Sequence, residues 1–440
     1  GTNARPPQAT STIDSPVTDT AGYLANGGIK NTATAATLTA TQARAATSSF
    51  LPANQQLGYS MTWNLGFQRV FAKDYTFEAR YVGTKGVHLL FQTQLNRAAV
   101  VTPSRNLPTF LTPPTAQQLA NLNLTLGDLV TLRGTPGVGN TLAQYGFTSN
   151  ITAYEPLGNS EYHGLALQLS RRYARNLLFT GSYTWSHLMD DSTAEVASII
   201  ATPRRPQDFN NIRGEWASSA LDHRHRLTFT SVFDTLWFSK DKNLFVRNVV
   251  GNWQLSGTYT AETGELVTPQ SGVDSNQNGD AAADRVILNV NGAAGTSSDV
   301  YGINKAGQRI ANSTAATNNA TIVAWVANDP NAQFVRAGLG TLATTGRNIM
   351  GSPRINNFDI TIAKNINIRE KVKLQLRADA FNAMNHPQYT LGRVNNVRLR
   401  NTFSSFTPNI YIPGDPLFGK YDQVYSSNPR NVQVSARLTF

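Results

Sequence analysis

Residues 431–440 at the end of the chain read NVQVSARLTF, and this stretch decides the class of fold. Every second residue is apolar, and the residues between them are polar or charged; the apolar positions are Val432, Val434, Ala436, Leu438 and Phe440. Successive side chains of a β-strand point to opposite faces, so this pattern predicts a strand with one apolar and one polar face. A helix would need apolar residues three and four positions apart, and this stretch does not supply them.

The same alternation recurs upstream and predicts an all-β, antiparallel protein. The predicted strands are 57–70, 75–90, 160–171, 177–188, 222–236, 250–264, 355–366, 371–384 and 431–440. Most of them exceed the roughly 5–6 residues usual in soluble sheets. They are also long enough for a tilted strand that crosses a bilayer, which needs about 9–11 residues.

The connections between these strands alternate in length. Short connections are predicted at 71–74, 172–176, 237–249 and 367–370, and long ones at 91–159, 189–221, 265–354 and 385–430. Short periplasmic turns and long external loops are typical of a transmembrane β-barrel. Bacterial single-chain barrels have even strand numbers. The odd number predicted here leads us to expect a truncated external segment at 1–56 and the C-terminal part of a larger barrel at 57–440.

The amino-acid composition of the chain excludes several classes of function. Charged residues make up 15% of the 440 residues, and the net charge is +11, so the chain carries less charge than the roughly 25% of ordinary soluble domains. The absence of cysteine excludes disulfides, cysteine-based zinc sites and thiol catalysis. Basic residues are spread along the chain without a basic helix, which predicts no nucleic-acid partner. No Ser-His-Asp ordering stands out, and we expect no enzymatic activity.

The charges of the polar faces predict which side meets lipid. Charged residues occupy these faces at Glu78, Arg80, Lys373, Arg377 and Arg437, among others. On a lipid face, a basic residue would cost about 2–4 kcal/mol at the bilayer midplane. The apolar faces are therefore predicted to meet lipid, and the excess positive charge is expected to pair with lipopolysaccharide and lumenal carboxylates. Aromatic residues beside the short turns predict an interfacial girdle, at Phe71, Tyr75, Tyr173, Trp237 and Phe238.

Several longer motifs carry a resemblance to a known family. They are 63–69 (WNLGFQR), 78–89 (EARYVGTKGVHL), 162–165 (YHGL), 183–187 (YTWSH), 222–227 (DHRHRL) and 377–387 (RADAFNAMNHP). Together they resemble TonB-dependent receptors of the Oar-like type. The resemblance implies a 22-stranded outer-membrane barrel of a Gram-negative bacterium that binds or takes up a nutrient through its external loops. It also implies an N-terminal plug and a TonB-contacting segment, neither of which is expected in these residues.

The last strand adds a partner to this interpretation. Phe440, with the apolar residues on its side of the strand, resembles the C-terminal strand that the barrel-assembly machinery recognises. Two alternatives to the receptor remain open. One is a barrel without a plug, which would act as a porin or in adhesion or secretion. The other is a soluble extracellular β-sandwich adhesin.

One loop has the spacing of a calcium site, and no other cofactor is expected. Asp274, Asn276, Asn278 and Asp280 alternate with other residues and surround Gly279, which partly matches the pattern D-x-[DN]-x-[DN]-G. The Glu expected at position twelve is absent, and Asp284 would have to replace it from one residue earlier. An ordinary polar turn would show the same residues. His223 and His225 could share a strand face that suits a metal, but their arginine neighbours favour a polar cluster.

Overall fold

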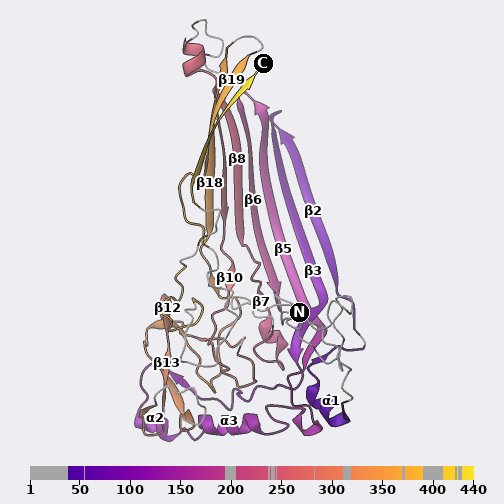
Figure 1. The fold of residues 1–440 in the computed structure, drawn as a ribbon, viewed down its shortest axis with the longest axis vertical. Helices are drawn as coiled ribbons and strands as arrows, with labels where there is room; N and C mark the ends of the chain where they lie inside the picture. Colours follow the sequence, from indigo (N-terminus) through magenta and orange to yellow (C-terminus); the bar gives the residue numbers. More distant parts are fainter. Residues whose placement is uncertain are drawn as a thin grey trace, which may run out of the picture.

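The long strands of the computed structural model form one antiparallel sheet in chain order (Figure 1). The structure describes residues 38–53, 55–193, 205–235, 238, 243, 245–281, 283–310, 319–368, 372–389, 410–421, 424 and 429–440. The strands of the main path are β2 (Tyr59–Phe71), β3 (Tyr75–Gln94), β5 (Thr152–Ala174), β6 (Leu177–Asp190), β8 (His225–Thr235), β9 (Trp253–Glu262), β18 (Ile355–Asn367), β19 (Lys373–Phe381) and β20 (Asn431–Thr439). Each corresponds to one predicted strand, so the all-β antiparallel prediction is confirmed.

Shorter elements surround the ends of this sheet. The helices are α1 (Ala40–Ala46), α2 (Ala116–Ala120) and α3 (Leu126–Gly134), with single turns η1 (Ala143–Tyr145), η2 (Ile212–Glu215) and η3 (Val246–Val250). The short strands are β1 (Ser49–Phe50), β4 (Thr109–Phe110), β7 (Ala217–Ser218), β10 (Leu266–Val267), β11 (Ile287–Leu288), β12 (Ala293–Ser298), β13 (Val300–Ile303), β14 (Arg309–Ile310), β15 (Ala324–Ala327), β16 (Ala332–Val335) and β17 (Met350–Gly351). None of the described helices is long and apolar enough to span a membrane.

The strand register gives the sheet one apolar and one polar face. An apolar row crosses six strands through Leu177, Phe233, Leu255, Ile362, Ala378 and Val434. A polar row on the opposite face joins Gln68, Glu78, Gln168, Ser182, Thr228, Thr260 and Asn357. Because a shift of one residue would exchange the two faces, the alternation seen in the sequence fixes the register.

The two ends of the sheet differ in their connections. Tight turns close one end, as between β5 and β6, where Arg175 and Asn176 both have positive φ (47° and 65°). Such a two-residue turn matches the twist of an antiparallel hairpin. The long connections gather at the opposite end, with α1, α2 and α3 farthest from the turns (Figure 1). The predicted segregation of short and long connections is confirmed.

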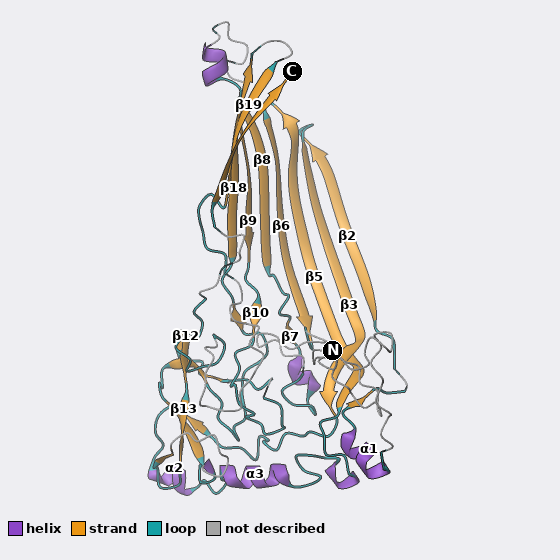
Figure 2. Cartoon of the chain, in the orientation of Figure 1, coloured by secondary structure: helices purple, strands orange, loops and turns teal. Residues whose placement is uncertain are grey.

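Two strand boundaries were predicted wrongly. Residues 91–94 and 152–159 were expected in a loop, but they belong to β3 and β5 and pair with each other, for example Phe91 with Glu155. The register shifts between Gly86 and Phe91, where His88 has a positive φ of 56°. This bulge interrupts the alternation in the sequence, although the hydrogen-bonded ladder continues beyond it. The two strands therefore carry the sheet into the region of the long connections (Figure 2).

The long connections have a hydrophobic core of their own. Its buried residues come from both 91–151 and 265–354, and they are Val100, Val101, Leu107, Leu126, Leu129, Val300, Ile322, Trp325, Ala327, Ala332 and Val335. By contrast, large side chains on the apolar face of the sheet remain exposed, such as Leu376 at 42%. The buried core of the described chain thus lies mainly in the connections, and we call the described residues within 91–151, 205–224 and 263–354 the loop assembly.

Candidate functional site

The loop assembly is built from segments far apart in the chain. Helix α3 begins with a capping box, in which the Thr125 hydroxyl accepts from the Asp128 N–H (3.1 Å) and the Asp128 carboxylate accepts from the Thr125 N–H (2.9 Å). The N–H of Leu126 donates to the carbonyl of Ile322 (2.8 Å). Nearby, β4 pairs in parallel with β15, with Trp325 opposite Thr109. These contacts join two long connections into one packed body.

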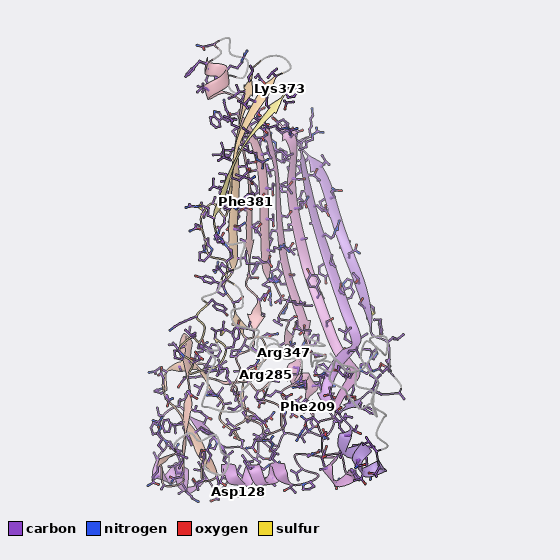
Figure 3. All side chains as sticks on the ribbon, in the orientation of Figure 1. Asp128, Phe209, Arg285, Arg347, Lys373 and Phe381 are labelled. Atoms are coloured by element: carbon purple, nitrogen blue, oxygen red, sulfur yellow. The ribbon has the colours of Figure 1, made fainter. Side chains whose placement is uncertain are left out.

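A buried ionic network ties this body to the strands. Arg285 forms an ion pair with Glu215 of η2, and Arg347 forms one with Asp190 at the end of β6. Arg347 also donates through Nε to the Glu215 carbonyl (3.0 Å). Burial lowers the pKa of Arg285, whereas the Glu215 carboxylate raises it. All four side chains are buried, and Figure 3 shows Arg285 and Arg347 close together in the upper part of the loop assembly, nearest the strands.

No pattern in the sequence predicts this network. Its four charged residues come from four separate segments, and no short motif relates them. Only their burial in the folded chain reveals that they act together. The network links the end of β6 to the loop assembly through groups that are buried, charged and hydrogen-bonded.

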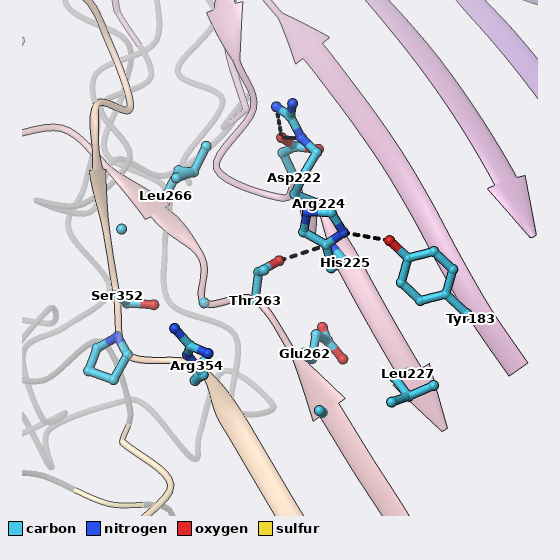
Figure 4. Close-up of a pocket in the computed structure, with 14 residues that line it drawn as sticks. Tyr183, Asp222, Arg224, His225, Leu227, Glu262, Thr263, Leu266, Ser352 and Arg354 are labelled. Atoms are coloured by element: carbon cyan, nitrogen blue, oxygen red, sulfur yellow. Dashed lines mark hydrogen bonds and ion pairs between the residues drawn. The ribbon is translucent and has the colours of Figure 1, made fainter. Parts of the chain in front are cut away.

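A pocket of about 770 Å³ lies where β8, β9 and β18 meet the loop assembly (Figure 4). His225 stacks on Tyr183, and its Nδ1 lies 2.8 Å from the Tyr183 hydroxyl. Arg354 lines the pocket and forms no ion pair with a described residue. Tyr183, Leu227 and Ala261 belong to one row of the apolar face. The pocket therefore lies on that face, at the loop end of the strands.

His223 and His225 do not form a common metal site. His223 precedes β8 and lies beside Glu262, with Nδ1 2.9 Å from Oε1, whereas His225 is bound to Tyr183. Their shared strand face was an expectation that the structure does not bear out, because the strand begins only at His225. Within the described ranges, no group of three or more His, Cys, Asp or Glu residues could hold a metal ion.

The residues of the predicted calcium-like loop do come together. The Asp274 carboxylate accepts from the Gly279 N–H (2.9 Å), and Asn276 and Asn278 accept from N–H groups two residues later. Asp284 reaches back to the loop and accepts from the Ser275 N–H (2.5 Å). Asp280 instead pairs with Arg205, whose Nη2 lies 2.9 Å from Oδ1. The arrangement offers carboxylate and amide oxygens, which are ligands that hard cations prefer.

The predicted aromatic girdle is partly present at the turn end of the strands. Phe71 stacks on Tyr75, with ring centroids 5.5 Å apart. Tyr173 differs, because its hydroxyl donates to Asp234 on the polar face (2.5 Å). Trp237 lies outside the described residues. The sequence did not predict the contacts of Lys364 on the apolar face, where its ammonium lies 4.9 Å from the Trp253 ring centre and donates to the Gly251 carbonyl. Near a membrane surface, a lysine can bury its stem in this way.

Comparison with known proteins assigns this chain to a family. A family model described as an outer membrane beta barrel domain matches residues 1–433. No curated protein matches the chain. Among solved structures, similarity extends to the outer membrane transporter YddB from Escherichia coli, at 8% identity and a TM-score of 0.33, covering 78% of this chain and 31% of that one. It also extends to the ferripyoverdine receptor of the outer membrane of Pseudomonas aeruginosa, at 10% identity and a TM-score of 0.32, covering 87% of this chain and 27% of that one. This chain thus spans less than a third of those proteins.

Proposed function

Because this chain belongs to the outer-membrane β-barrel domain family and lies in the outer membrane, we propose that it is the barrel portion of a TonB-dependent receptor of the Oar-like type. In this proposal it is not an enzyme, and it binds a nutrient through the loop assembly for uptake across the outer membrane. The barrel would be closed and of the 22-stranded kind, in a Gram-negative bacterium. The motifs noted above, from residues 63–69 to 377–387, support the subfamily.

The single observation that carries the receptor proposal is the packed loop assembly. A general diffusion pore needs an open lumen, and its loops need no joint core. Here two long connections share buried apolar residues, and a buried ionic network fixes them to the strands. A rigid scaffold that positions loops is the usual arrangement for specific binding.

The remaining partners follow from the same proposal. Lipid would cover the apolar face, and anionic lipopolysaccharide would meet the loop end of that face, where Arg354 lines the pocket. The barrel-assembly machinery would recognise the last strand through Phe440, whose side chain is 93% exposed. Contact with TonB would belong to a plug-bearing segment ahead of the barrel. No nucleic-acid partner is proposed.

Uptake that depends on energy distinguishes the receptor from the porin. The intact protein would be produced in cells with and without TonB, and retention of small molecules from a mixed nutrient extract would be measured by mass spectrometry. A receptor should concentrate a compound only when TonB is present. Equal, size-limited entry in both strains, together with open-channel conductance in planar bilayers, would favour the porin. The soluble adhesin does not fit a member of an outer-membrane family.

A further inference from the structure

The loop at 274–284 folds so that its oxygen-bearing side chains turn inward. Asp274, Asn276 and Asn278 each accept a hydrogen bond from an N–H of the loop itself, at 2.8–2.9 Å. Gly279 has a φ of +92°, a backbone conformation that residues other than glycine rarely adopt. Each bond fixes one side chain against the loop backbone. The side chains at positions one, three and five are thereby held against one turn of the backbone.

A second observation concerns two carboxylates of this loop. Asp284 is completely buried, and its Oδ1 atom has no hydrogen-bond partner among the described residues. The Oδ1 atom of Asp274 is likewise buried without a partner. The other oxygen of each carboxylate is bound by a loop N–H. Two anionic groups thus each keep a free oxygen in the interior, where an unpaired charge is costly.

The nearby arginines reach only one oxygen of this pair. Arg133 lies 3.3 Å from Asp274, but its side chain is 42% exposed and its bond goes to Oδ2, the oxygen that already has a partner. Arg205 pairs with Asp280 instead. Asp284 forms no ion pair with any basic side chain that the structure describes. Asp274 thus has only the half-exposed Arg133 as an ion-pair partner, and Asp284 has none among the described residues.

We propose that this loop binds one calcium ion between Asp274 and Asp284. The side-chain oxygens of Asn276 and Asn278 and the peptide oxygen of Asp280 would complete the protein ligands. Calcium takes six to eight oxygen ligands in flexible geometry, so water would fill the remaining positions. Only two carboxylates take part, which agrees with the absence of a three-residue acidic or histidine cluster in the described residues. The carboxylate of Asp280 stays with Arg205.

The position of the loop gives the ion a role. Asn276 and Asn278 both donate to the Gln207 carbonyl (2.5 and 3.0 Å), and the Asn276 carbonyl accepts from Val100 and Val101 (3.1 Å each). The loop therefore touches all three connections of the loop assembly. Calcium bound here would order the junction from which the assembly is built, rather than take part in a reaction.

The test measures calcium binding and thermal stability in one set of variants. The intact outer-membrane protein would be purified in detergent, stripped with chelator and titrated with CaCl2 by calorimetry. We expect one site with a Kd of about 10⁻⁴–10⁻³ M, the range of extracellular calcium modules. Asp284→Asn should weaken binding at least about tenfold, since it removes one of two charged ligands. Calcium should raise the Tm of the wild-type protein but not that of this variant.

Measurements of Tm in chelator distinguish a metal site from a polar turn that binds no metal. Without calcium, Asp284→Asn should have a higher Tm than the wild-type protein, because it removes a buried charge that has no partner. The variant should therefore be more stable than wild type in chelator and lose its advantage in calcium. Asp329→Asn is the matched control, since Asp329 caps an exposed turn of the same connection at the Asn331 N–H (2.9 Å). It should bind calcium like the wild-type protein. Equal Tm values of the wild-type protein with calcium and with chelator, or unchanged calcium binding by Asp284→Asn, would overturn the proposal.

Discussion

Leu376 and Gln375 are neighbours in the chain but lie on opposite faces of β19. Leu376 pairs with Ala436 on the apolar face, whereas Gln375 pairs with Arg437 on the polar face. A basic residue on the lipid face costs about 2–4 kcal/mol at the midplane. We therefore expect Leu376→Arg to lower the free energy of unfolding in phospholipid bilayers by about that amount, and Gln375→Arg to lower it by less than about 1 kcal/mol, through repulsion by Arg437 on the neighbouring strand. Equal losses in a denaturant titration would contradict the assignment of the two faces.

Asp191 gives the stability a specific pH dependence. Its buried carboxylate accepts from the N–H and the side-chain amide of Asn159 (2.8 and 3.1 Å), and burial raises its pKa. Above its usual pKa of about 4, the folded chain retains a proton that the unfolded chain loses. The stabilisation from this group is therefore largest at low pH and is lost as the pH rises through the raised pKa.

Asp191→Asn keeps an acceptor for Asn159 and removes the titration. The free energy of unfolding of the wild-type protein, minus that of the variant, should fall as the pH is raised from about 4 towards neutral. Guanidinium unfolding in detergent at several pH values measures this difference. Parallel pH curves for the two proteins would show that Asp191 titrates normally.

Single residues differ in how far the sequence predicts them. The conformation around Gly279 was predictable, because its hydrogen bonds join residues only two to five positions apart. The place of Lys364 was not, since alternation alone assigns it to the apolar face without showing the Trp253 ring and Gly251 carbonyl that hold it. Contacts between residues close in the sequence can be predicted from the sequence, whereas contacts with residues of other strands cannot.

At the scale of elements, the junction between η2 and the loop assembly depends on Glu215. Glu215 is buried, and its removal would leave Arg285 without its carboxylate partner. Breaking a buried ion pair in this way typically costs about 3–5 kcal/mol. We expect Glu215→Ala to destabilise the loop assembly by about that amount, measured as faster proteolysis of residues 263–354 and a lower Tm.

A matched control tests whether burial is the cause. Glu161 contacts His163 on β5 at 2.9 Å, but its side chain is 39% exposed. Exposed pairs contribute about 0–1 kcal/mol, so Glu161→Ala should have a small effect. The double variant Glu215→Ala/Arg285→Met should recover part of the loss, because no unpaired guanidinium remains. If all three variants behaved alike, the network would have no special role.

The strands of the sheet were predictable, whereas the loop assembly was not. A strand carries its own signal, because the two faces of the sheet require alternating residues along each strand. The signal failed at the bulge near His88, where β3 continues beyond its predicted end. Strands such as β4 and β15 are only two and four residues long, and their pairing joins distant parts of the chain. Such short elements have no period to detect.

At the scale of the whole molecule, the two ends of the sheet should face different compartments. Val290 is 81% exposed in the loop assembly, and Lys73 lies in the turn between β2 and β3. The chain has no cysteine, so single cysteines can be labelled cleanly. A membrane-impermeant maleimide should label Val290→Cys on intact cells and Lys73→Cys only after permeabilisation. Labelling of Lys73→Cys alone on intact cells would invert the orientation.

The pairing of β4 with β15 also sets an order of events during biogenesis. The β-hairpins of the sheet join neighbouring segments and can form as soon as both strands have crossed the inner membrane. Leu126 and Leu129 can be buried only after Ile322 and Trp325 are available, and these two residues lie about 200 positions later in the chain. Until then these side chains are exposed to the periplasm, and long-range closure of this kind is slow and prone to aggregation. Until the later connection is available, the chain is therefore most prone to aggregation at this part of its sequence.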